Sequence, residues 1–111
     1  IVTQMFFDNK AYFRFVEECR AAGITVPIIP GLKPLTTKNQ THILPSMFHI
    51  DVPADLYDEV EKCKNNEEAA QIGTEWCIAQ SKELVEANVP CLHYYTMGTS
   101  GATKAVASAI F

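Results

Sequence analysis

Three short apolar runs divide the chain, and each has the composition of a β-strand. The first, Val2–Phe7, is rich in aromatic and branched residues and contains one amide, Gln4. The second, Thr25–Ile29, is apolar after its threonine, and the third is Cys91–Thr96. Continuous apolar strands are typical of parallel sheets that are covered on both faces. We therefore expect a parallel sheet with three buried strands.

The amide of Gln4 is unusual because its neighbours in the first run are apolar. A buried polar side chain that lacks a hydrogen bond costs about 1–3 kcal/mol. If the strand is buried, Gln4 therefore needs a partner. The residues alone leave three partners open, which are the protein backbone, water and a ligand.

The segments around these strands carry apolar residues at helical spacing. The first helix follows the first strand, with Asp8 or Asn9 as its N-cap, and it ends at Gly23. The segment Pro30–Pro34 is too rich in proline and glycine to be helical, and we expect Pro45 to end a helix. Three helices are predicted between the second and third strands and one more after the third: 35–44, 54–63, 67–88 and 102–111.

The order of these elements, β-α-β-(α-α-α)-β-α, is typical of an α/β fold with a parallel sheet. The 111 residues are one domain's worth of chain at most. A (β/α)₈ barrel takes about 250 residues, so this length would cover a little under half of one. The chain begins with Ile1, which already leads into a strand, and this suggests a piece of a longer protein. Functional groups are expected at the carboxyl ends of the strands, in loops 7–9, 30–37 and 96–100.

Composition and charge argue against two classes of protein, those that bind nucleic acid and those that span a membrane. Hydrophobic residues make up 48% and charged residues 20%, as in a soluble globular protein. The formal charge of −4 gives no electrostatic case for nucleic acid. No apolar run approaches the ~20 residues of a membrane-spanning helix, and the start does not resemble a signal peptide. We therefore expect a cytoplasmic protein that binds neither nucleic acid nor a membrane.

Four cysteines are compatible with two disulfides, a metal site or free thiols. They are spaced 44, 14 and 14 residues apart, with no C-x-x-C pair and no clustered histidines. These spacings favour buried free thiols in a reducing compartment, and no bound metal.

Four motifs occur in an order and spacing that resemble the methylenetetrahydrofolate reductase family. The resemblance covers essentially the whole chain. The motifs are TQMFFD at 3–8, CRAAGI at 19–24, PIIPGLKP at 27–34 and VPCLHYYTM at 89–97.

The resemblance implies that residues 1–111 are the C-terminal three βα units of a (β/α)₈ TIM barrel. Extra helices would lie between the second and third strands, and the N-terminal strands would be absent. Members of this family are flavoproteins of one-carbon metabolism and methionine biosynthesis. They bind FAD at the carboxyl ends of the strands. NADH or NADPH reduces the flavin, which then passes a hydride to 5,10-methylenetetrahydrofolate to give 5-methyltetrahydrofolate.

The same resemblance implies roles for particular residues. Gln4 matches a glutamine that contacts the folate pterin or the nicotinamide, and Gln40 matches a second substrate-contacting glutamine. Leu44 stands where some members have an aromatic residue, and Thr96 and Met97 are expected to make peripheral ligand contacts. An arginine common after the last strand is absent from the segment 95–99. The catalytic acid and most FAD contacts would belong to sequence outside this chain.

Other residues have simpler interpretations. His93 is expected to be a core histidine, and Trp76 a packing residue at helical spacing. His42 and His49 are expected to face solvent or a neighbouring helix. A rival hypothesis is that the 111 residues form a non-catalytic half-barrel or assembly module. Its open strand edges would then associate with a second copy or with the missing half.

Overall fold

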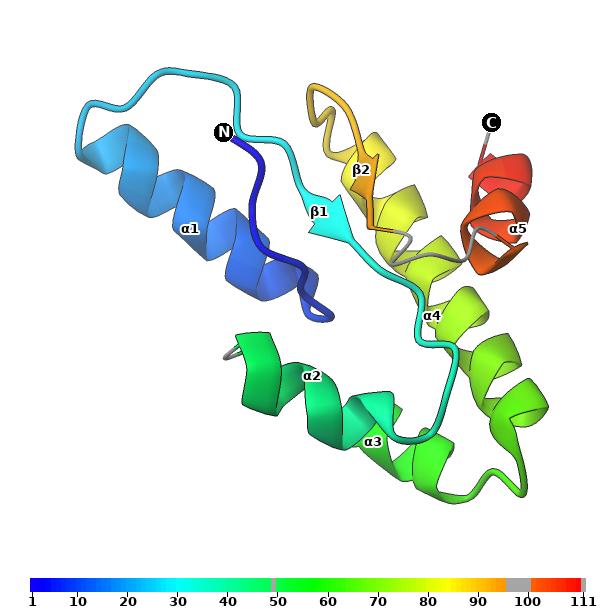
Figure 1. The fold of residues 1–111 in the computed structure, drawn as a ribbon. Coiled ribbons are helices and arrows are strands. Elements are labelled where there is room, and N and C mark those ends of the chain that lie inside the picture. Colours follow the sequence, from blue (N-terminus) through cyan, green and yellow to red (C-terminus); the bar gives the residue numbers. More distant parts are fainter. Residues whose placement is uncertain (49, 96–100, 111) are drawn as a thin grey trace.

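The structure is a computed structural model that describes residues 1–48, 50–95 and 101–110. The described residues form a helix-rich α/β arrangement, in which the two strand arrows of Figure 1 point the same way. The elements in chain order are α1 (Asn9–Ala21), β1 (Gly31–Leu32), α2 (Gln40–Phe48), α3 (Ala54–Glu61), α4 (Asn66–Glu86), β2 (His93–Tyr94) and α5 (Gly101–Ile110).

The sheet is parallel, as the sequence predicts. Strand β1 pairs with β2 in the register Gly31↔His93 and Leu32↔Tyr94. The N-terminal segment joins β1's side of the sheet through one parallel bridge, Val2↔Ile29. The segment 30–34 is not helical, as predicted, and its residues Gly31 and Leu32 form β1. The N–H of Tyr95 donates to the Leu32 carbonyl oxygen at 2.8 Å.

The first strand is much shorter than predicted. From Thr3 onward, side chains make hydrogen bonds that backbone groups would make in a regular sheet. The N–H of Thr3 donates to the Ile29 carbonyl oxygen at 3.0 Å, but the N–H of Gly31 donates to Thr3 Oγ1 instead of a backbone carbonyl. The Tyr95 hydroxyl donates to the Thr3 carbonyl oxygen at 2.8 Å. A Cβ atom on Gly31 would lie 2.6 Å from that oxygen and 2.7 Å from the Tyr95 ring. Only glycine therefore fits at this crossing of three segments.

The predicted helix boundaries hold for α1, α3 and α4 within a few residues. Asp8 caps α1 by accepting a hydrogen bond from the N–H of Lys10 at 3.0 Å. Gly23 follows the helix with φ of 86°, in the left-handed region that glycine adopts without strain. Asn65 caps α4 in the same way, through the N–H of Glu68.

Helix α2 differs from the prediction because Pro45 lies inside it rather than ending it. The helix begins at Gln40 and continues to Phe48. Proline removes one hydrogen bond from a helix interior. The residues on either side still pack inward, since Leu44 is only 2% exposed and Phe48 contacts the same core. Burial of these two side chains favours continuing the helix past the proline.

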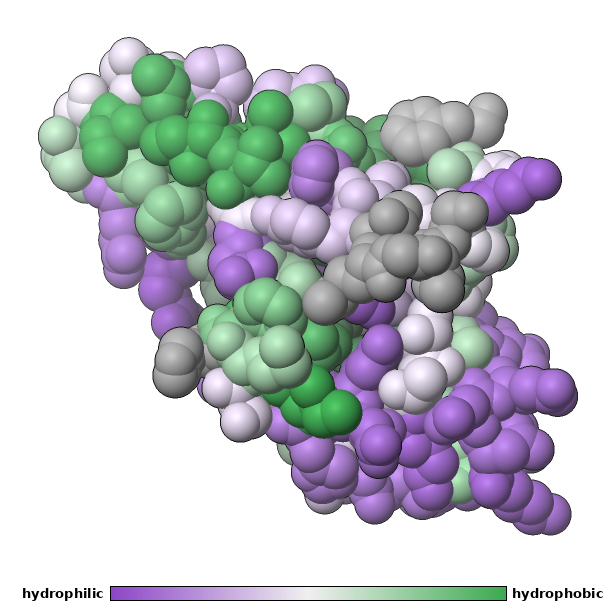
Figure 2. Space-filling view, viewed as in Figure 1, coloured by the Kyte–Doolittle hydropathy of each residue, from purple (hydrophilic) through white to green (hydrophobic). Residues whose placement is uncertain are grey.

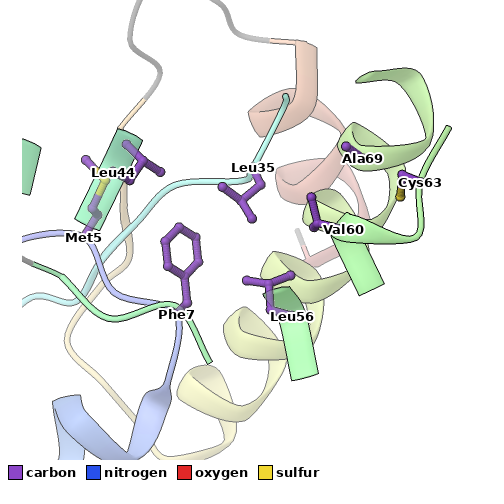
Figure 3. Close-up of a cluster of buried hydrophobic side chains, with 8 residues drawn as sticks. All are labelled: Met5, Phe7, Leu35, Leu44, Leu56, Val60, Cys63 and Ala69. Carbon is purple, nitrogen blue, oxygen red and sulfur yellow. The ribbon is translucent and has the colours of Figure 1, made fainter. Parts of the chain in front are cut away.

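The core consists of two clusters of buried side chains. Figure 3 shows the first, in which Phe7 faces side chains from the loop after β1 and from α3: Met5, Phe7, Leu35, Leu44, Leu56, Val60, Cys63 and Ala69. The second joins α1 to β1, α4 and α5: Tyr12, Cys19, Ile28, Leu32, Cys77, Leu84 and Val106. Trp76 packs against the first cluster, as predicted, and its Nε1–H donates to the Phe7 carbonyl oxygen at 2.8 Å.

One surface is strongly apolar. Large hydrophobic side chains are exposed along the N-terminal segment, on α1 and in the loop that follows α1, and we call them the apolar edge: Ile1, Val2, Phe15, Ile24 and Val26. Figure 2 shows a continuous hydrophobic area over this part of the molecule. Ile1 is 57% exposed and Val2 46%, so the predicted burial of the first strand was wrong at its start. An apolar strand of a parallel sheet is normally covered by another strand or a helix on this side.

Candidate functional site

The loop that leaves β1 carries a buried lysine and a hydrogen-bonded glutamine, Lys33 and Gln40. It begins at Lys33, directly after the strand, and ends where α2 begins at Gln40. In parallel α/β folds, ligand sites lie at the carboxyl ends of strands, which is where this loop lies.

Lys33 is buried, with only 3% of its surface exposed. Its Nζ donates to the Pro34 carbonyl oxygen at 3.1 Å and makes a longer contact of 3.5 Å with Gln40 Oε1. Burial lowers the pKa of Lys33 below its ordinary value, because removing an ammonium from water disfavours its charged form.

Gln40 lies at the start of α2, where the sequence places it, and it closes the loop. Its Oε1 accepts a hydrogen bond from the N–H of Thr36 at 2.7 Å, and its Nε2 donates to Thr36 Oγ1 at 3.1 Å. The carbonyl end of this amide is therefore occupied by Thr36 and Lys33. The Nε2 group has a second N–H that these bonds do not use. A ligand contact by Gln40 would use that N–H.

Gln4 is exposed, so its predicted burial was wrong. Its Oε1 accepts a hydrogen bond from the N–H of the next residue, Met5, at 3.0 Å. The side chain lines an apolar cavity of about 410 Å³ together with Phe6, Tyr12 and Phe15. The physical reason for the exposure is that the N-terminal segment has a strand partner on one side only.

The structure does not bring all of the predicted site residues together. Within the described part of the chain, no hydrogen bond joins Gln4 to Gln40. Leu44 lies in the first core cluster, where a ligand would have to displace buried neighbours. Thr96 and Met97 lie outside the described residues. The assigned roles of all five stay predictions.

The histidines separate into two kinds. His93 is exposed and contacts the edge of the Tyr95 ring at a centroid distance of 4.7 Å, so its predicted burial was wrong. His93 lies on β2, which has β1 as its strand partner on one side only. His42 is exposed, as predicted, and its Nε2 lies 3.4 Å from Glu61 on α3. His49 lies outside the described residues.

Sequence reasoning missed the burial of Lys33. The signal was available, because Lys33 is the only charged residue between Arg20 and Lys38. A lone charge inside an apolar segment that ends a strand is a candidate for a buried ionisable group.

A second polar network fastens the end of the N-terminal segment to α4. The Nδ2 group of Asn9 donates to the Gln80 carbonyl oxygen at 3.1 Å and to Glu83 at 2.9 Å. Gln80 Nε2 donates to the Phe6 carbonyl oxygen at 3.2 Å. The bond from Gln80 satisfies a backbone carbonyl that the short first strand leaves unpaired, which indicates a structural role.

The cysteines are all free, as predicted. Three of them are buried, but Cys91 is exposed, so its predicted burial was wrong. The strand that was predicted to begin at Cys91 begins two residues later, and this leaves the thiol in a surface loop. Among the described residues, no group of three His, Cys, Asp or Glu side chains is arranged to hold a metal ion.

Comparison with known proteins decides the family. A sequence model described as methylenetetrahydrofolate reductase matches residues 1–110. The chain belongs to the methylenetetrahydrofolate reductase family. It is 32% identical over 108 residues to a probable methylenetetrahydrofolate reductase (NADPH) of Caenorhabditis elegans. It is 33% identical over 102 residues to a probable methylenetetrahydrofolate reductase (NADH) of rice, Oryza sativa subsp. japonica.

A bacterial relative in the methylenetetrahydrofolate reductase family is the 5,10-methylenetetrahydrofolate reductase of Escherichia coli, with 29% identity over 106 residues. The matches cover 96%, 87% and 95% of this chain for the worm, rice and bacterial proteins. They cover only 16%, 16% and 36% of those proteins. The chain therefore spans about a sixth of the two eukaryotic relatives and about a third of the bacterial one.

Within the described residues, no helix is both long enough and apolar enough to cross a membrane.

Proposed function

We propose that the protein carrying this chain reduces 5,10-methylenetetrahydrofolate to 5-methyltetrahydrofolate with NADH or NADPH as the reductant and FAD as the cofactor. The observation that carries this proposal is the family match over residues 1–110. The names of the worm and rice relatives, which include NADPH and NADH, support a nicotinamide dinucleotide as the electron donor. For this chain, the choice between NADH and NADPH as the electron donor stays open.

We further propose that the chain supplies the last three βα units of a (β/α)₈ barrel. Three extended segments follow one another in parallel, with Val2 bridged to Ile29 and β1 paired with β2. Sequential parallel neighbours joined through helices are the connectivity of a barrel. The preceding unit of the barrel would pack against the apolar edge, where Ile1 and Val2 are exposed.

This chain would form part of the folate and nicotinamide side of the site. Gln40 offers one N–H that its bond to Thr36 leaves unused, and Gln4 offers an exposed side chain within the N-terminal segment. Neutral amides suit this role because they can bond a pterin edge or a carboxamide without placing a full charge beside a hydride transfer. FAD would carry the hydride from the nucleotide to the folate when bound.

The residues described here fit a supporting part of an FAD site rather than the whole. The loop after β1 offers one buried cation, Lys33, and the free N–H of Gln40. A dinucleotide pyrophosphate is usually held by several backbone N–H groups at a helix N-terminus. We therefore assign most FAD contacts, and the catalytic acid, to other parts of the parent protein.

The proposed activity is tested on the full-length parent protein. Oxidation of NADH and NADPH is followed with 5,10-methylenetetrahydrofolate as the acceptor, and 5-methyltetrahydrofolate is measured as the product. An active enzyme forms product in step with nucleotide oxidation. Absence of product with a folded, flavin-loaded protein would refute the proposal.

The role of Gln4 is tested by Gln4→Leu in the same protein. Among the described residues its side chain bonds only the N–H of Met5, so we expect little change in unfolding free energy but about a tenfold loss in folate turnover. The matched control is Gln71→Leu on the exposed face of α4. Normal rates of both flavin reduction and folate reduction in Gln4→Leu would remove Gln4 from the site.

The rival proposal, a non-catalytic assembly module, is favoured by the apolar edge. Exposed apolar groups of this size are typical of surfaces that associate. Adding FAD to the purified 111-residue chain separates the two proposals. A protein-bound flavin spectrum would favour a competent site. Self-association without flavin binding would favour the module, as a homo-oligomer or with the rest of a barrel.

A further inference from the structure

Lys33 is a buried cation without a carboxylate partner. Within residues 1–48, 50–95 and 101–110, the ion pair that lies within 4.0 Å joins His42 to Glu61, and it does not involve Lys33. The residues outside this part include neither aspartate nor glutamate. Lysine is almost never fully buried unless it is paired. The ammonium at the end of β1 therefore needs an explanation.

A structural role explains Lys33 poorly. Its two acceptors in the protein are neutral, the Pro34 carbonyl oxygen at 3.1 Å and Gln40 Oε1 at 3.5 Å. Gln40 Oε1 already accepts a shorter bond of 2.7 Å from the N–H of Thr36, so the loop is closed without the lysine. Burying an ammonium costs more than two such contacts return. A methionine would fill the same space without that cost.

The position of Lys33 suits contact with a ligand. It follows β1 directly, and the register Leu32↔Tyr94 places it beside Tyr95 on the neighbouring strand. Tyr95 in turn bonds the Thr3 carbonyl oxygen, one residue before Gln4. The ammonium has three N–H groups, and the protein acceptors occupy at most two of them. The residue itself lies at the carboxyl end of β1, where parallel α/β folds place their ligands.

We propose that Lys33 is an anion-binding residue of the site, whose ammonium binds a carboxylate or phosphate oxygen of a bound substrate. This inference rests on the proposed function for the identity of the substrates. Those substrates are anionic, since the folate carries carboxylates and the nicotinamide dinucleotide carries phosphates. A buried cation is stabilised when such an oxygen becomes its counter-charge. The site then uses a charge that the fold alone leaves uncompensated.

The test compares Lys33→Met and Lys33→Arg with the wild type in the full-length parent protein. Binding of 5,10-methylenetetrahydrofolate and of NADH or NADPH is measured separately, by KM and by the rise in Tm that each ligand produces. Losing one charge-assisted hydrogen bond should weaken one of the two ligands about 10- to 100-fold. The ligand that loses affinity identifies the source of the anion, and Lys33→Arg should restore part of it.

Thermal unfolding without ligand separates binding from a structural role. Lys33→Met should keep or raise the Tm of the ligand-free protein, because it removes an uncompensated buried charge. Unchanged affinity for both ligands would overturn the proposal. It would also be overturned if Lys33→Met failed to fold or lost several degrees of Tm, since the ammonium would then be structural. Lys62→Met, at an exposed lysine after α3, is the matched control and should change neither quantity.

The Tm shifts require binding but no turnover, so failure of the proposed function is distinguishable. If the wild type bound these ligands but made no 5-methyltetrahydrofolate, the activity proposal would fail and Lys33 would still be tested. If the wild type were active and Lys33→Met bound both substrates normally, only the Lys33 proposal would fail.

Discussion

Gly73 is the point of closest approach between α4 and the loop that leaves β1. A Cβ atom at this position would lie 2.7 Å from Leu35 Cβ and 2.8 Å from the Leu35 carbonyl carbon, and it would also collide with the Leu35 carbonyl oxygen. All three atoms belong to the backbone or its first side-chain carbon. No rotamer change can move them away, so Gly73→Ala must displace the helix or the loop.

The expected loss of stability follows from two opposing terms. Forcing an extra methyl group into a well-packed site costs about 1–3 kcal/mol, and contact with backbone atoms places Gly73 toward the upper end. Replacing glycine by alanine in a helix interior returns up to about 1 kcal/mol. We therefore expect Gly73→Ala to lower the free energy of unfolding by about 2 kcal/mol. Leu35 is two residues from Lys33, so substrate affinity should fall as well.

Urea unfolding of the parent protein, followed by circular dichroism, measures this change. Gly101→Ala is the matched control, because a Cβ atom there has no neighbour within 4 Å. It should leave stability unchanged or raise it slightly. If Gly73→Ala were as stable as Gly101→Ala, the close contact between α4 and the loop would be refuted.

Three further predictions concern the cysteines and the cap of α1. Cys91 should react with a thiol reagent in the folded protein, whereas Cys77 should react only on unfolding, which mass spectrometry of labelled peptides would show. Burial raises the pKa of Cys77 from 9.0 to about 12, so the folded protein keeps a proton that the unfolded chain loses. The free energy of unfolding should therefore fall as the pH rises above 9.0, and Cys77→Ala should reduce that slope. Asp8→Ala should cost about 1 kcal/mol of stability and Asp8→Asn much less, and equal losses would contradict the capping role.

The local parts of the fold could be predicted from the sequence because their causes are local. The cap at Asp8 and the turn at Gly23 depend on neighbouring residues only, and both occur where expected. Pro45 shows the limit of this reasoning. Its missing N–H argues for a helix end, but burial of Leu44 and packing of Phe48 outweigh one lost hydrogen bond.

The site was harder to predict because burial depends on distant partners. Apolar neighbours suggested that Gln4 is buried, yet the exposure of a strand residue depends on whether another strand or helix covers it. For Lys33 the error is the opposite one, because lysine is ordinarily exposed and this side chain is buried. Its burial follows from the closed loop, in which Gln40 bonds Thr36. No local sequence pattern predicts that closure.

The hydrogen bond from Trp76 to the Phe7 carbonyl oxygen also has an optical consequence. Trp76 is the one tryptophan in these 111 residues. Its indole donates a hydrogen bond to Phe7, at the end of the N-terminal segment and three residues after Gln4. Indole emission shifts in wavelength and intensity when its N–H partner or its surroundings change. In the 111-residue chain, fluorescence therefore follows a single position, and that position reports whether α4 and the strand ends are joined.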